Sequence, residues 1–210
     1  MTDELQDLYD AEQQLVKAIP KMIDAANSSE LQQALKEHLS VTQNQVKRLE
    51  QVFSELGEKA QKKPCKGMAG IISEGQEMIE EDLEEATMDA AIISAAQKVE
   101  HYEIASYGTV RTLAQTLGNN EVADLLEESL NEEKEADELL TQIAESSINA
   151  EAASEENESG DAESSGTGRS KASAGSRSSS SSRSGGSNGG GARSKSRTTR
   201  RSRGKTKAGR

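Results

Sequence analysis

Residues 93–117 have the sequence ISAAQKVEHYEIASYGTVRTLAQTL. Apolar or small side chains recur in it at steps of three and four residues, the spacing that places them on one face of an α-helix. Glu100 and Glu103 fall on the same face, near the middle of the segment. The segment therefore predicts a long helix whose buried side is interrupted by carboxylates. The full stripe is Ile93, Ala96, Glu100, Glu103, Tyr107, Val110, Ala114 and Leu117.

Three other segments show the same interruption, each with apolar residues at both ends and polar residues at the centre. The first stripe is Leu5, Leu8, Glu12, Leu15, Ile19 and Met22. The second is Leu31, Leu35, His38, Thr42, Gln45, Leu49, Val52 and Leu56. The last is Val122, Leu126, Ser129, Glu133, Ala136, Leu140 and Ile143. Together with a shorter helix expected from about Met68 to Glu85, the pattern predicts an all-α, antiparallel bundle of four long helices.

The expected helix ends follow from residues with known preferences at those positions. Thr2, Ser28 and Thr87 are candidates for N-caps, because their hydroxyl oxygens can accept a hydrogen bond from a free backbone N–H of the first turn. Gly57 and Gly118 are placed where a left-handed residue ends a helix. These positions divide residues 1–150 into the bundle helices.

The central polar residues would be costly to bury unless something offsets their charge. Carboxylates that meet at one level of a bundle repel one another unless they share protons or bind cations. Ferritin-like two-metal proteins meet this need with one Glu from each of two helices and a Glu-x-x-His motif from each of the other two. We therefore predict a carboxylate-rich site for Fe or Mn, with Thr42 and Gln45 in the same polar band. Its candidate ligands are Glu12, His38, Glu100, Glu103 and Glu133.

Other interpretations of the band remain open. A chain in which 30% of residues are charged places some Glu residues on any helix face by chance. A buried hydrogen-bond network that sets the register of a structural helical dimer is another explanation. His38 is either a ligand or a core histidine bonded to Glu100 or Glu133. His101 lies one residue off the stripe and outside the predicted ligand set.

Charge separates the chain into two unlike parts. Residues 1–163 contain 12 Lys and Arg against 37 Asp and Glu, a formal charge of −25, whereas residues 164–210 contain 13 Lys and Arg and no acid. After Ile148 the chain contains no Leu, Val, Ile, Phe, Tyr or Met. We therefore expect an acidic linker over 151–163 and a disordered basic Ser/Gly-rich tail over 164–210.

The basic tail has no aromatic residue for base stacking, so it would contact phosphates without selecting a sequence. DNA or RNA is therefore its predicted partner. Association with acidic bodies, or a solubilising role alone, are the alternatives. The candidate contact residues are Arg193, Lys195, Arg197, Arg200, Arg201, Arg203, Lys205, Lys207 and Arg210.

Several short blocks resemble the YciE/YciF-type family of the ferritin-like superfamily. They are DLYDAEQQL (7–15), EHL (37–39), RLEQVF (48–53), CKGM (65–68), VEHYEIASYGT (99–109) and EEKEAD (132–137). The resemblance covers about residues 2–147. It implies a ferritin-like bundle, a role in bacterial stress responses and a homodimer.

The superfamily's metal pattern is matched only in part. Glu12 matches the carboxylate of the first helix, and Glu100 or Glu103 matches the single carboxylate of the third long helix. Where the pattern has two Glu-x-x-His motifs, this chain has Thr42-x-x-Gln45 and Glu133-x-x-Ala136.

The sequence therefore predicts a cytoplasmic stress-response protein with a weak carboxylate metal site and a tail that binds nucleic acid. The start of the chain lacks the apolar core of a signal peptide, and no apolar run approaches the ~18 residues of a membrane span. A di-iron or di-manganese oxidase or peroxide-consuming enzyme is one alternative, and a purely structural helical dimer is another.

Overall fold

In the computed structural model, residues 1–155 can be described, and they form a helical bundle. Most of the expected acidic linker and the whole basic tail lie outside this range. The described part contains α1 (Thr2–Ala25), α2 (Ser29–Glu55), α3 (Lys66–Ile79), α4 (Glu85–Thr116), α5 (Asn120–Ile143) and the π-helical turn η1 (Ala144–Ile148), and it has no strand. The predicted all-α class is confirmed. Within residues 1–155, no helix combines the length and apolar character that crossing a membrane requires.

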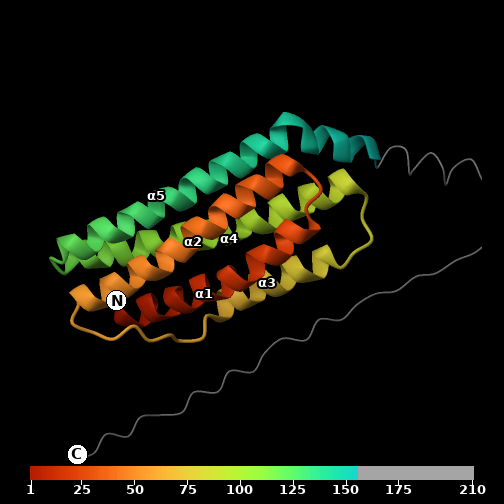
Figure 1. Ribbon diagram of the computed structural model, residues 1–210. Helices are drawn as coiled ribbons and strands as arrows, with labels where there is room; N and C mark the ends of the chain where they lie inside the picture. Colours follow the sequence, from red (N-terminus) through yellow and green to blue (C-terminus); the bar gives the residue numbers. More distant parts are fainter. Residues whose placement is uncertain (156–210) are drawn as a thin grey trace, which may run out of the picture. The chain divides into compact units, whose positions relative to one another are not determined.

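The bundle consists of two helical hairpins joined by a long crossover (Figure 1). The first hairpin is α1 and α2, the second is α4 and α5, and α2 packs against α5 while α1 packs against α4. Because α2 and α4 run in the same direction, the connection between them must return along the bundle. The short helix α3 lies in this connection and packs on α4 and α1. One long crossover of this kind is typical of ferritin-like bundles.

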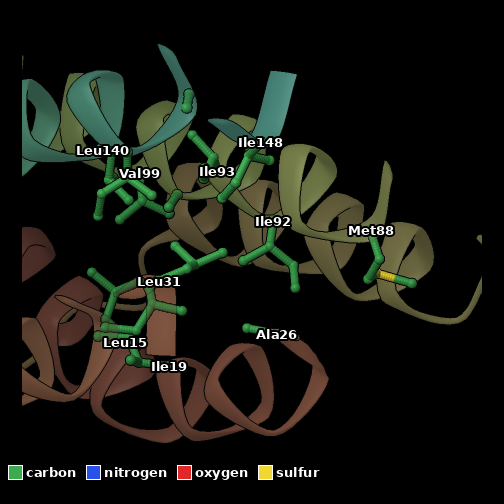
Figure 2. Packing of buried hydrophobic residues seen from close by; sticks show 14 of the residues in the cluster. Leu15, Ile19, Ala26, Leu31, Met88, Ile92, Ile93, Val99, Leu140 and Ile148 are labelled. Carbon is green, nitrogen blue, oxygen red and sulfur yellow. The ribbon is translucent and has the colours of Figure 1, made fainter. Parts of the chain in front are cut away.

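Two apolar clusters fill the core, one on each side of the polar band. Cluster A contains Leu15, Ile19, Leu31, Ile92 and Leu140 among others, and Figure 2 shows these side chains meeting between the helices. Cluster B, which lies toward the start of α1, is built around Leu5, Phe53, Tyr107, Val110 and Leu126. The band residues therefore lie between two apolar layers.

The helix α3 is shorter than expected and covers one side of α4. It begins at Lys66, whereas the sequence suggested Met68 to Glu85, and the backbone leaves the helix after Ile79. A second apolar stripe of α4 includes Met88, Ile92 and Val99, and these residues lie in cluster A. This stripe is part of the core.

The crossover is attached to α1 and α4 by hydrogen bonds around Cys65. The Asp10 carboxylate accepts from the Cys65 N–H at 2.8 Å, and the Gln14 amide donates to the Cys65 carbonyl at 3.1 Å. The Cys65 Sγ lies 3.0 Å from the Tyr102 hydroxyl, which in turn donates to Asp7. A Cβ at Gly67 would stand 2.7 Å from the Tyr102 ring, so glycine permits this close approach. Cys65 is therefore a buried packing residue of the fold.

Some of the expected helix ends are confirmed and others are wrong. The Ser28 hydroxyl accepts from the Leu31 N–H, and Gly57 and Gly118 have positive φ angles of 70° and 79°. Thr2 and Thr87 are not N-caps, because Met1 and Glu84 occupy those positions without a side-chain cap. Both threonines lie inside the first turn, where their hydroxyls reach other acidic side chains.

The start of α4 is capped by a residue from the other end of the described chain. The helical backbone continues beyond η1 to residue 155. There, the Glu155 carboxylate accepts from the N–H groups of Ala86 at 3.0 Å and Thr87 at 2.9 Å. A carboxylate satisfies the free N–H groups of a helix start and suits its positive dipole end. The segment that the sequence assigned to a linker therefore begins as a helical extension that closes this end of α4.

Asp89 holds the turn between α1 and α2 in the same way. Its two carboxylate oxygens accept from the N–H groups of Asn27 and Ser28, both at 2.7 Å, and only 3% of Asp89 is exposed. The carboxylate of α4 thus ties the first hairpin to the second. Without it, two N–H groups at the start of α2 would lose their acceptor.

We expect Asp89→Ala to lower the free energy of unfolding by roughly 2–4 kcal/mol, because two charge-assisted hydrogen bonds are lost and their donors are left near the core. Urea denaturation at neutral pH measures the change. Asp82→Ala is the matched control, since Asp82 is exposed, and its effect should stay within roughly 0.5 kcal/mol. Equal effects of the two substitutions would contradict this role of Asp89.

Candidate metal centre

Four carboxyl groups from three helices are buried at one level of the bundle. Glu12 comes from α1, Glu100 and Glu103 from α4, and Glu133 from α5. None of the four is more than 2% exposed. Their helical spacing explains the placement, because each lies on the core stripe of its helix at mid-length. The predicted convergence of the four carboxylates is present.

A compact group of ligand atoms forms around His38. One ligand atom from each of His38, Glu100, Glu103 and Glu133 lies within 4.8 Å of the others. Both glutamates of α4 contribute an atom to this group. Glu12 is outside this tightest group but adjoins it, since charge on Glu133 raises its pKa. His101 is excluded, because its side chain is 70% exposed and pairs with Asp137.

Two of these carboxyls each accept a hydrogen bond from a neighbouring side chain. The Tyr107 hydroxyl donates to Glu12 Oε1, and the Gln45 amide donates to Glu133 Oε1. Thr42 contributes nothing to the cluster directly, because its hydroxyl donates to the His38 carbonyl of its own helix at 2.9 Å. Tyr107 and Gln45 therefore act as positioning residues that fix the rotamers of the carboxyls.

Many of the cluster's buried polar atoms have no hydrogen-bond partner. Buried polar groups are nearly always paired, so this concentration of unpaired atoms calls for further partners, which shared protons, water or a bound cation can supply. These atoms are Oε2 of Glu12, Nε2 of His38, Oε2 of Glu100, Oε1 of Glu103 and Oε2 of Glu133.

Burial shifts the protonation of the whole cluster. It raises the pKa of Glu12, Glu100 and Glu103 well above the ordinary 4.5, and the neighbouring carboxylates raise these values further. The pKa of Glu133 rises to about 7, since burial outweighs the stabilising contacts with Glu100 and Gln45. Burial also lowers the pKa of His38 to about 4. At neutral pH the imidazole is uncharged, and the carboxyls hold shared protons in the absence of cations.

The donor set fits a divalent transition metal. Carboxylate oxygens suit Mn²⁺ and an imidazole nitrogen suits Fe²⁺, and a neutral imidazole is the form that binds metal. Each of the five side chains has an oxygen or nitrogen atom that lacks a hydrogen-bond partner and could bind a metal. Two divalent cations would balance the charge of four ionised carboxylates. Glu12, His38, Glu100, Glu103 and Glu133 are thus the residues that would hold Fe or Mn.

Comparison with known proteins places the chain in a family. Residues 1–153 match a family described as a domain of unknown function, DUF892. The chain belongs to the DUF892 family. The match ends shortly before the last described residue, so it includes the bundle and excludes the basic tail.

The relatives of this DUF892 protein share its bundle. Protein YciF of Escherichia coli strain K12 is 46% identical over 149 residues, which are 70% of this chain and 90% of YciF. The crystal structure of the E. coli stress protein YciF has a TM-score of 0.68 and 44% identity, covering 70% of this chain and 93% of that one. YcfI of Rhodopseudomonas palustris has a TM-score of 0.66 and 45% identity, covering 67% and 89%. The ferritin-like fold and the resemblance to YciF are confirmed for the bundle.

The DUF892 bundle also contains a charged pair that the stripes did not reveal. Arg48 Nη1 and Nη2 donate to the two oxygens of Glu132 at 2.7 and 2.9 Å, and Nη1 also donates to Ser129. The Gln45 amide donates to the same Glu132 at 3.0 Å. Arg48 lies one turn from Gln45 on α2, but only the packing of α2 on α5 shows which acid it pairs with.

Because the carboxyl cluster is protonated, we expect the free energy of unfolding of the metal-free DUF892 protein to fall as pH rises. In the unfolded chain these carboxyls ionise near pH 4.5, and in the folded chain at higher pH, so the folded state holds more protons at neutral pH. The carboxyls contribute fully to the free energy of unfolding below their pKa in the unfolded chain. This contribution is lost as pH rises through their pKa values in the folded chain. Each proton contributes a slope of about 1.4 kcal/mol per pH unit.

Chemical denaturation in chelator, from pH 6.5 to about pH 8, measures this slope. Most of the window lies above the opposing titration of His38, whose pKa is about 4 in the folded chain and ordinarily 6.5, so this titration reduces the slope only at the acidic end. Replacing both Glu100 and Glu133 by Gln should flatten the slope. A free energy of unfolding that is constant or rising across the window in the unaltered protein would contradict the prediction.

Proposed function

We propose that this protein is a cytoplasmic stress-protection protein whose bundle binds Fe or Mn weakly and whose basic tail binds DNA or RNA without sequence selection. The convergence of unpaired, buried carboxyl oxygens with one neutral imidazole is the observation that supports the metal site most directly. The similarity to a protein described as the E. coli stress protein YciF supports the stress role.

The expectation of weak binding rests on the nitrogen donors. Where the two-metal pattern has a histidine on each of two helices, this chain has Gln45 and Ala136, so His38 alone supplies imidazole. The Gln45 amide donates hydrogen bonds to Glu133 and Glu132, so it does not replace the missing imidazole as a metal ligand. A bound Fe or Mn would add Lewis-acid and redox chemistry to the cluster. The side chains themselves would hold and orient the metal.

Metal analysis of the protein purified without chelator, followed by titration with Mn²⁺ and Fe²⁺, tests the centre. We expect stoichiometric binding that is lost when Glu12 and Glu133 are both replaced by Gln, because each substitution removes a negative charge and one of the two carboxylate oxygens while the size is kept. Glu55→Gln with Glu121→Gln is the matched control, since both residues are exposed. Absence of stoichiometric Fe or Mn after aerobic reconstitution would remove the metal centre from the proposal.

Turnover and stability measurements on the same double Gln variant separate the two alternative functions. An oxidase or peroxide-consuming enzyme requires metal-dependent turnover that the double Gln variant lacks. The hydrogen bonds of Tyr107, Gln45 and Arg48 favour the other alternative, a structural network that sets the register of a helical dimer. That alternative requires the double Gln variant to lose stability without any metal effect. A homodimer is part of our proposal, and a single-chain mass in solution would exclude it.

The tail part of the proposal rests on charge alone, because residues 164–210 lie outside the described range. Their 13 Lys and Arg residues without any acid favour phosphate contact. Such contact releases counterions, so affinity should fall steeply with salt. The bundle itself carries a large negative charge and would repel a polyanion.

Retardation of duplex DNA by the full chain and by a chain ending at Glu163 tests the tail. This end point keeps Glu155, so the cap of α4 remains intact. We expect retardation by the full chain at low salt, weaker retardation at high salt, and none by the shortened chain. A full-length variant with Gln at all nine candidate positions from Arg193 to Arg210 controls for length. Equal retardation by the full and shortened chains would rule out the tether.

A further inference from the structure

A cavity of about 230 Å³ opens between α2 and α5 and reaches the carboxylate cluster. Its walls are largely apolar and include Leu35, Val41, Ala136 and Leu140. Ala136 stands where the two-metal pattern would place an imidazole, so a small side chain leaves this space open. An apolar cavity of roughly 150 Å³ is enough to bind benzene. The pocket therefore has room for one ring or a short alkyl chain with a polar substituent.

The inner end of the pocket presents two polar groups that lack partners. Glu100 is 2% exposed, and its Oε2 has no hydrogen-bond partner. The Nε2 of His38, also unpartnered, lies 3.4 Å from Glu100 Oε1. Leaving buried polar atoms unpaired is costly. A ligand that offers several N–H donors at this depth would satisfy both groups.

The charged residues around the pocket favour a positively charged ligand. Glu37, Glu132 and Glu135 also line it, while Lys and Arg are absent from its lining. Glu132 is paired with Arg48, whereas Glu37 and Glu135 are exposed carboxylates at the entrance. This field repels anions and attracts cations. Hydrated metal ions gain nothing from the apolar walls, whereas an organic cation uses both the walls and the carboxylates.

We propose that this pocket binds a small primary ammonium ion with an apolar body, its three N–H donors directed at Glu100 and His38 and its hydrocarbon part lying against Ala136 and Leu140. An ammonium group supplies three donors and no acceptor, which matches the acceptors at the inner end. The proposal does not require a bound metal. Because it uses Glu100, it makes the organic cation and a metal ion competitors.

Benzylammonium is a suitable probe, and the two histidines of the chain are the reporters. His38 lines the pocket, whereas His101 lies outside it with an exposed side chain and serves as an internal reference. We expect imidazole NMR signals of the metal-free full chain to show a saturable shift at His38 and little change at His101. Benzoate should give no saturable shift. Benzyl alcohol should bind at least about tenfold more weakly, the loss expected without a charge-assisted hydrogen bond.

Two variants separate the pocket from the acidic surface. Ala136→Leu fills the cavity, and Glu100→Gln removes the carboxyl that ionises when the ammonium group pairs with it. Each substitution should weaken benzylammonium binding at least about tenfold. Ala105→Leu, an equivalent change at an exposed position of α4, should leave it unchanged. If Ala136→Leu fails to fold, Glu100→Gln decides. No saturable response at His38, equal binding by benzyl alcohol, or unchanged binding in the decisive variant would overturn the proposal.

Titration with Mn²⁺ distinguishes this proposal from the metal centre. Benzylammonium binding in a protein that takes up no Mn²⁺ supports the pocket and excludes the metal. The reverse result, Mn²⁺ binding without a response to benzylammonium, excludes the pocket alone. When both ions bind, Mn²⁺ must displace benzylammonium, and simultaneous full occupancy would contradict the shared use of Glu100.

Discussion

The burial of four carboxyl groups at one level of the bundle is the constraint to which the rest of the structure responds. Ionised carboxylates lose hydration there and repel one another, so they need protons, donors or cations. The structure supplies donors to Glu12 and Glu133 from Tyr107 and Gln45. Other oxygens remain unpaired. Apolar packing in the two clusters on either side offsets the free-energy cost of burying these carboxyls.

The same constraint ties the helices together in register. Sliding α4 past α1 by one turn would separate Tyr107 from Glu12, and sliding α5 past α2 would separate Glu133 from Gln45. Apolar contacts tolerate small shifts, because they have no preferred direction, whereas hydrogen bonds lose strength within a few tenths of an ångström. The polar band thus contributes specificity of packing, and the apolar clusters contribute most of the favourable free energy.

Departures from the two-metal pattern have two different structural consequences. Gln45 stands where the pattern has a histidine ligand, and its amide instead donates a hydrogen bond to one oxygen of Glu133. At Ala136 the loss of a large side chain leaves the pocket that opens toward Glu100. The first change weakens the case for tight metal binding, and the second gives the cluster an apolar entrance. Both changes act on the same buried carboxyls, so a metal ion and an organic cation would compete for Glu100.

The sequence alone determined the helical bundle and the identity of the band residues, because helical periodicity places Glu12, His38, Glu100, Glu103 and Glu133 on apolar stripes. It could not determine the hold of Asp89 on the turn before α2, the cap of α4 supplied by Glu155, the pairing of Arg48 with Glu132, or the pocket beside Ala136. These depend on distances between helices remote in the chain. Periodicity fixes the direction of a side chain on its own helix, whereas its partner across the bundle is decided by how the helices pack.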